Sequence, residues 1–249
     1  MAEVRELIPT KLSKPKKKLS DYLFLIYGVA KIGKTSLLAQ MPEALFLFFE
    51  PGGKALRLRQ IAVKNWRHLK NVIDALEEDK KGVKNIVIDP IDYTFRACES
   101  YILKNKFGGI TDPSEAPFGK AWKAIRWEFT DQILRIANLG IGVFFISHVS
   151  EKEIEPEDEA AYSKIMPSMA KQPNEIISGM VDITGYCRYG KKGRRELIIR
   201  GSKTLEAGHR LKERFKGIEK IPMGNSAEEA YQNLLAAFEN RLAETGKEG

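Results

Sequence analysis

The sequence predicts an α/β domain with a mainly parallel central sheet flanked by helices, a C-terminal β-hairpin and a terminal helix. Two observations predict this class. A glycine-rich octet at residues 28–35, GVAKIGKT, lies between an apolar run and a helix-forming segment. Short apolar runs then alternate along the chain with longer amphipathic segments, as in proteins built from strand–helix–strand units. At 249 residues and 43% hydrophobic content, the chain is long enough to bury one core.

The octet matches the phosphate-binding pattern GxxxxGK[ST] at every fixed position. The apolar run at 23–27 predicts a buried strand before it, and the segment at 36–41 predicts a helix after it. Glycines let successive N–H groups point at one anion, and we expect an exposed Lys34 ammonium to bridge the β- and γ-phosphates. The Thr35 hydroxyl is the expected ligand of Mg²⁺. The octet and the next residue therefore predict a site for a nucleoside triphosphate and Mg²⁺, formed by Gly28, Val29, Ala30, Lys31, Ile32, Gly33, Lys34, Thr35 and Ser36.

The rest of the chain predicts a single domain over residues 21–249, preceded by a flexible basic arm at 1–20. Further strands are expected at 44–49, 85–89 and 142–147, and a hairpin from 181–189 and 196–200. Helices are expected at 66–79, 93–106, 118–139 and 227–243. The stretch at 149–179 is polar and contains three prolines, which favours a functional loop or insertion.

Polar side chains follow three of the predicted strands, where the ligand of a parallel sheet binds. Asp89 ends an apolar strand and is expected to hold Mg²⁺ beside Thr35. Glu50 is our candidate for the base that orients the attacking water, and Asp92 is its rival. His148 ends the fourth strand, where it would sense the γ-phosphate.

Composition points to a partner class. The formal net charge of +8 suits a polyanion such as nucleic acid, although it also serves solubility. Two widely separated cysteines favour reduced thiols in the cytoplasm, and no apolar run is long enough to span a bilayer. We therefore expect a cytoplasmic protein with no membrane partner.

Taken together, five motifs resemble those of RecA-like P-loop ATPases, and in particular phage nucleotide-binding proteins of the RadA-like single-strand annealing type. They are GVAKIGKT, FFEPGG at 48–53, NIVID at 85–89, FISH at 145–148 and KERF at 212–215. The resemblance implies that Glu50 is the catalytic glutamate and that Lys212 and Arg214 act on a neighbouring subunit's nucleotide. The last motif departs from the family's KNRFG, because Glu213 replaces the asparagine and Lys216 precedes the glycine.

By the same resemblance, segments 104–120 and 149–177 correspond to DNA-binding loops. Six acidic residues at 151–159 would repel DNA, so the Tyr162–Gln172 half of the second segment is the part expected to bind. The implied function is an ATPase that forms a ring or filament on single-stranded DNA and promotes annealing or strand exchange in phage-type recombination. A recombination or replication protein would be a further partner, and a phage-encoded chain would act in the bacterial cytoplasm.

An alternative function stays open: the protein can instead be a DNA-independent nucleotide switch that couples a protein partner to DNA replication. The role of the basic hairpin around 190–195 is also open, since it can be a nucleic-acid surface or a subunit contact. A small-molecule kinase is disfavoured, because no arginine-rich lid follows the second strand.

Overall fold

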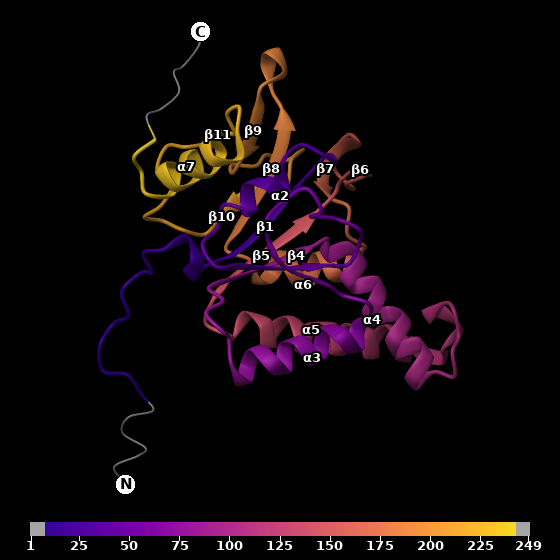
Figure 1. Ribbon diagram of the computed structural model, residues 1–249. Coiled ribbons are helices and arrows are strands. Elements are labelled where there is room, and N and C mark those ends of the chain that lie inside the picture. The colour runs from indigo at the N-terminus through magenta and orange to yellow at the C-terminus, as the bar shows by residue number, and fades with distance from the viewer. Residues whose placement is uncertain (1–7, 243–249) are drawn as a thin grey trace.

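The computed structural model describes residues 8–242 (Figure 1). Within them, nine strands form one sheet in the order β11-β9-β8-β1-β5-β4-β2-β3, with β10 paired to β8. The strands of this sheet are β1 (Leu23–Gly28), β2 (Ala44–Phe48), β3 (Arg59–Ala62), β4 (Asn85–Asp89), β5 (Gly142–Ser147), β8 (Ile183–Tyr189), β9 (Arg195–Ile198), β10 (Gly208–His209) and β11 (Lys220–Pro222). A separate hairpin consists of β6 (Val149–Ile154) and β7 (Tyr162–Pro167).

Six strands from β3 to β8 run parallel, whereas β9, β10 and β11 add antiparallel pairs at one side. The predicted fold class is therefore confirmed. The register sets the carboxyl ends level, since Tyr27 pairs with Ser147 and Phe48 pairs with Asp89. Residues that follow β1, β2, β4 and β5 consequently meet at one edge of the sheet.

Helices cover both faces of the sheet, because successive side chains of each strand point to opposite sides. Leu25, Leu47 and Phe145 belong to one core cluster, together with buried residues of four helices on that face. Their sequence neighbours Ile26, Phe46 and Phe144 belong to the other cluster, which the two remaining helices close. The first face carries α3 (Trp66–Glu78), α4 (Ile91–Lys106), α5 (Lys120–Ala137) and α6 (Lys171–Met180), and the second carries α2 (Lys34–Leu38) and α7 (Ala227–Phe238).

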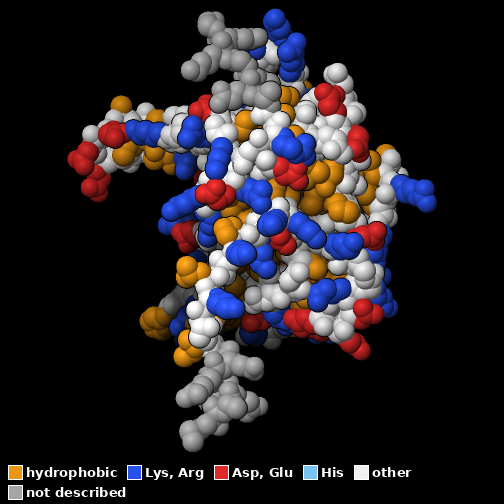
Figure 2. All heavy atoms as spheres, turned by 90° about the vertical axis from the view of Figure 1, so that its left-hand side faces the viewer, with side chains coloured by type: hydrophobic (Ala, Val, Ile, Leu, Met, Phe, Trp, Pro, Cys, Tyr) orange, Lys and Arg blue, Asp and Glu red, His pale blue; other side chains and the backbone are white. Residues whose placement is uncertain are grey.

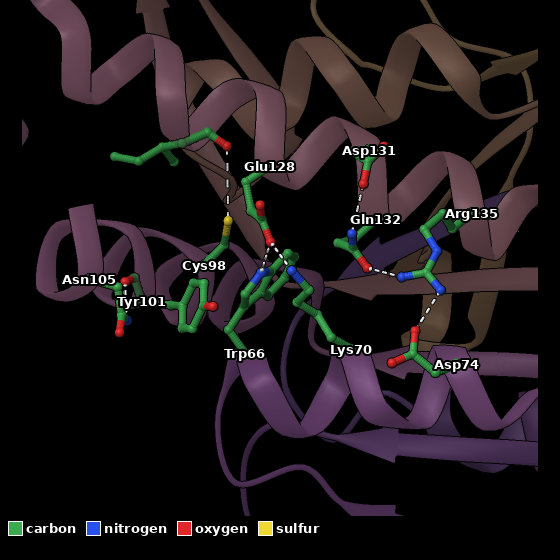
Figure 3. A network of polar contacts seen from close by, with 11 residues as sticks. Trp66, Lys70, Asp74, Cys98, Tyr101, Asn105, Glu128, Asp131, Gln132 and Arg135 are labelled. Atoms are coloured by element: carbon green, nitrogen blue, oxygen red, sulfur yellow. Dashed lines mark hydrogen bonds and ion pairs between the residues drawn. The ribbon is translucent and has the colours of Figure 1, made fainter.

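A polar network joins α3 to α5 (Figure 3). The Glu128 carboxylate accepts hydrogen bonds from Trp66 Nε1 and Lys70 Nζ, both at 2.9 Å. Burial acts to raise the pKa of Glu128, but these two bonds outweigh it and lower that pKa. Arg135 donates to Glu77 at 2.9 and 2.5 Å and to Asp74 at 2.6 Å. The network fixes how the two helices pack under the sheet.

Most predicted elements are confirmed to within a few residues, but three findings differ from the sequence prediction. The segment 149–179, predicted as a polar loop or insertion, is mostly regular, because it folds into β6, β7 and most of α6. Strands β3, β10 and β11 were not predicted, since none is an apolar run. The last helix ends at Phe238 rather than at residue 243, which lies outside the described residues.

The arm at 1–20 is described only from residue 8. Residues 8–18 are exposed and contain no helix or strand, and a short 3₁₀ turn at Leu19–Asp21 leads into β1. In the part of the chain that the structure describes, no helix combines the length and apolarity needed to cross a membrane.

Candidate nucleotide-binding site

The phosphate loop connects the end of β1 to the start of α2. Gly28 and Gly33 have φ angles of 154° and 109°, a region that side chains with a Cβ rarely adopt. Gly28 also lies directly against the backbone of β8, where a Cβ would collide with the carbonyl oxygen of Cys187. Both glycines of the pattern are thus required by backbone geometry.

Lys34 is buried, which corrects our expectation of an exposed ammonium. Only 6% of the residue is exposed, and its Nζ donates to the carbonyl oxygens of Gly28 at 2.8 Å and Val29 at 2.9 Å. Burial lowers the pKa of Lys34, whereas the carboxylates of Asp89 and Glu50 act to raise it. The loop therefore folds around a buried positive charge.

Asp89 and Thr35 meet as predicted. The Thr35 hydroxyl donates to Asp89 Oδ2 at 2.8 Å, and Asp89 is 7% exposed. Burial raises the pKa of Asp89, and the nearby Glu50 carboxylate adds to this effect. The Thr35 hydrogen bond and the positive charge of Lys34 act in the opposite direction.

Glu50 and His148 lie together at the open side of the site. Glu50 Oε1 is 3.9 Å from His148 Nε2, and about a third of each side chain is exposed to solvent. Ser147, the other polar residue at the end of β5, is fully buried, and its hydroxyl donates to the His148 carbonyl at 3.2 Å. Of the two polar residues at the end of β5, Ser147 and His148, only His148 faces Glu50.

Asp92, the rival to Glu50, has a different environment. Its Oδ1 accepts a hydrogen bond from Ser168 Oγ at 2.6 Å, and the Ser168 amide donates to the His148 carbonyl at 2.9 Å. Its Oδ2 is buried and has no hydrogen-bond partner among the described residues. Asp92 therefore holds the junction between β7 and α6 against the end of β5, whereas Glu50 is the carboxylate that water reaches.

The donor set fits ATP with Mg²⁺. Among residues 8–242, no cluster of three or more His, Cys, Asp or Glu side chains could hold a metal by itself. Mg²⁺ in phosphate-transfer sites is typically held by one or two protein oxygens together with phosphate oxygens. Thr35 and Asp89 supply such oxygens at the end of the phosphate loop.

Lys212 and Arg214 are not part of this cluster. Arg214 donates to the carbonyl oxygens of Lys16 and Lys17, both at 3.3 Å, and its guanidinium lies 4.6 Å from the centre of the Phe238 ring. These contacts tie Arg214 to the arm and to α7. Lys212 is exposed. The predicted role of both residues on a neighbouring subunit stays a prediction.

Two residues near the loop were missed by sequence reasoning. The Tyr27 hydroxyl, at the end of β1, donates to the Glu206 carbonyl at 2.6 Å, and burial raises the pKa of Tyr27. Arg195 of β9 donates to the Ile32 carbonyl of the phosphate loop at 3.4 Å. Alternation along β9 is the signal that could have found Arg195, because it shares the face of the buried Leu197.

Comparison with known proteins agrees with this geometry. Residues 20–211 match the family model described as AAA domain, so the chain belongs to this family of P-loop NTPases. The chain is also 25% identical, over 237 residues, to the SPbeta prophage-derived uncharacterized protein YorG of Bacillus subtilis (strain 168). That alignment covers 90% of this chain and 69% of the relative.

We expect Asp89→Asn to stabilise the protein without nucleotide while weakening Mg²⁺-dependent nucleotide binding. A carboxyl with a raised pKa holds its proton more tightly in the folded state, so its ionisation at neutral pH lowers the free energy of unfolding. An amide oxygen can still accept the Thr35 hydrogen bond but carries no charge. Urea denaturation at pH 7 measures the first effect and a nucleotide titration the second. A less stable variant would contradict this account of Asp89.

Proposed function

We propose that this protein is an ATPase that binds single-stranded DNA and promotes annealing or strand exchange in phage-type recombination. The observation that carries the ATPase part is the position of Glu50 beside His148, at the same sheet edge as Lys34, Thr35 and Asp89. A triphosphate bound in the loop would extend its terminal phosphate toward this edge.

In ATP hydrolysis, each polar side chain at this sheet edge would have a different role. Lys34 contributes positive charge at the phosphates, and Mg²⁺ held by Thr35 and Asp89 would neutralise further phosphate charge. Glu50 accepts a proton from water as the water oxygen bonds to the γ-phosphorus and the bond to the ADP oxygen breaks. His148 lies where it can contact the departing phosphate and respond to its presence.

The β6–β7 hairpin is the part of the chain best placed to report nucleotide state to DNA. It follows His148 directly, and its return strand β7 contacts the end of β1 through Tyr27, whose hydroxyl is 3.4 Å from the Ile165 carbonyl. One side of β7 carries the half-buried Tyr162 and Lys164, in the half predicted to bind DNA. Both have partners within the chain, because Lys203 lies over the Tyr162 ring and Lys164 pairs with Glu206 at 3.3 Å.

The other predicted DNA loop, at 104–120, is farther from the site. It begins in the last turn of α4, which starts just after Asp89 and is 16 residues long. At 1.5 Å per residue, this helix separates the loop from Asp89 by about 24 Å. Figure 1 shows the connection between α4 and α5 projecting away from the sheet. We therefore assign nucleotide-coupled DNA contact to β7 and the residues up to Gln172.

Basic side chains also support a polyanionic partner. Figure 2 shows lysine and arginine side chains spread over the face that carries the arm and α7. Exposed members on the arm and on the segment before α7 include Lys14, Lys16, Lys17, Lys212, Lys216 and Lys220. This charge would attract DNA without reading its sequence.

The most specific parts of the proposed function are the role in phage-type recombination and the assembly of several subunits. The prophage origin named for the relative in B. subtilis supports a phage context, and the motifs resemble the RadA-like annealing type. In that arrangement, subunits form a ring or filament, and Lys212 and Arg214 of one subunit add positive charge to the nucleotide of the next.

A second candidate is the DNA-independent nucleotide switch, which couples a protein partner to DNA replication. The observation that favours it is the acidic β6–β7 hairpin, where Glu151 and Glu153 lie exposed on β6. This charge would repel DNA and suits a basic protein surface.

Glu50→Gln should bind ATP with unchanged affinity but lower kcat by a factor of about 10² to 10⁴, because it removes the group that accepts the proton. Asp92→Asn is the matched control and should change kcat much less. Single-turnover hydrolysis and nucleotide titration of both variants give the answer. If Asp92→Asn is the inactive variant and Glu50→Gln turns over normally, the assignment of the base is reversed.

ATP turnover should rise when long single-stranded DNA is added, and the rise should fade between about 50 and 200 mM salt as phosphate contacts weaken. Lys34→Ala provides the background rate. Equal turnover with and without DNA, combined with no DNA binding at low salt, would contradict the recombination proposal and favour the switch. A protein partner captured with ATP in the absence of DNA would then support that second function.

Mixing two inactive variants tests the shared site. Lys34→Ala lacks a working phosphate loop, and Arg214→Ala lacks the group proposed to act in trans, so a mixed assembly should contain some interfaces with both groups intact. We expect turnover of the mixture to exceed the sum of the separate variants. Mixing Lys34→Ala with Glu50→Gln is the control, because both changes lie in one subunit's own site, on the loop side of the interface. A mixture without gain would place Arg214 outside the catalytic site.

A further inference from the structure

The basic hairpin formed by β8 and β9 contains one arginine that is turned inward. Lys191, Lys192 and Arg194 at its tip are exposed, as expected for an outer surface. Arg195, the next residue, is partly buried and faces the phosphate loop. An inward-facing Arg195 fits neither a nucleic-acid surface nor a subunit contact, the two roles considered for this hairpin.

Arg195 bridges two separate segments. Its Nη1 donates to the Ile32 carbonyl of the phosphate loop at 3.4 Å, and its Nη2 donates to the Gly224 carbonyl, in the turn before α7, at 2.9 Å. Its own carbonyl accepts a hydrogen bond from the Met223 amide at 2.9 Å. The planar guanidinium is suited to two acceptors at once, whereas a lysine ammonium is a point charge.

The bond to Ile32 has a directional consequence for the loop. The peptide between Ile32 and Gly33 is planar and trans, so its C=O and N–H point in opposite directions. Holding the Ile32 carbonyl toward Arg195 therefore turns the Gly33 N–H away from Arg195. The φ angle of 109° at Gly33 belongs to the same arrangement, and a Cβ there would lie 2.9 Å from Arg195 Nη1.

We propose that Arg195 is a positioning residue of the nucleotide site, which fixes the Ile32–Gly33 peptide so that its N–H faces the phosphates. Its guanidinium also places a positive charge behind the loop, where it favours an anion in front. This inference rests on the nucleotide-binding part of the proposed function and does not depend on DNA.

Three variants test the inference, with binding of a fluorescent ATP analogue in the presence of Mg²⁺ as the readout. Arg195→Ala should weaken binding by about tenfold. Arg195→Lys should recover only part of the loss, because one ammonium replaces a fork that spans two carbonyls. Arg200→Ala is the matched control: its guanidinium pairs with Glu219 at 3.0 Å on the exposed surface, so its affinity should equal that of the wild type.

Two further readouts separate positioning from a general loss of structure. In steady-state ATP turnover, Arg195→Ala should raise KM more than it lowers kcat, because Glu50 stays in place. Low millimolar guanidinium chloride should partly restore nucleotide binding to Arg195→Ala, whereas the same concentration of sodium chloride should not. Thermal unfolding of each variant shows whether it is folded.

Arg195→Lys keeps the charge and most of the packing, so it decides the question if Arg195→Ala does not fold. Wild-type affinity in Arg195→Lys, or in a folded Arg195→Ala, would overturn the inference. If the wild-type protein itself binds no nucleotide, the proposed function fails instead. A wild type that binds nucleotide but ignores DNA leaves the inference on Arg195 intact.

Discussion

The buried ammonium of Lys34 is the constraint on which the arrangement of the site depends. A charge removed from water must be compensated by hydrogen bonds or opposite charge. The loop supplies carbonyl oxygens from Gly28 and Val29, which is possible only because the chain turns through conformations that glycine adopts freely. The same loop conformation places Gly28 against the backbone of β8. The β8–β9 hairpin therefore lies directly behind the nucleotide site. The position of β8 next to β1 is therefore as necessary to the site as the octet itself.

The level ends of the parallel strands determine which acidic groups gather around this charge. Because β2 and β4 are in register, Glu50 and Asp89 lie at the same edge, and the negative charge of Glu50 helps to raise the pKa of Asp89. A raised pKa at Asp89 means that the folded protein without ligand bears an electrostatic cost at this edge. A bound cation would relieve that cost, so ligand binding and folding stability are linked here. Glu50 is less buried and keeps access to water, which distinguishes the two carboxylates by environment rather than by residue type.

The sequence was sufficient for features that depend on local pattern. The octet, the apolar runs and the acids at their ends predicted the fold class, the order of the central strands along the chain and the meeting of Thr35 with Asp89. It was not sufficient where tertiary contacts decide. Lys34 is buried by the surrounding loop and strands, and no local pattern marks that enclosure. The segment 149–179 forms a hairpin and a helix although it is polar, because its strands pair with each other and Ile165 packs on Tyr27 and Tyr186. Arg195 is indistinguishable from the exposed Lys191, Lys192 and Arg194 by composition, and only the alternation along β9 marks it as inward-facing.

The contacts of the β6–β7 hairpin indicate how nucleotide binding or hydrolysis would change the binding of a partner. The hairpin of β6 and β7 touches the site at three places: the chain continues into it from His148, Ser168 binds Asp92, and Tyr27 reaches the backbone of β7. The first link is covalent, the Ser168–Asp92 hydrogen bond is 2.6 Å long and the Tyr27–Ile165 contact is 3.4 Å, so a shift at the sheet edge would be passed to the hairpin. The connection between α4 and α5 has no comparable link, because the length of α4 separates it from Asp89. In our proposal, a partner that responds to ATP is therefore bound at the hairpin, whether it is DNA at Tyr162 and Lys164 of β7 or a basic protein on the acidic strand β6.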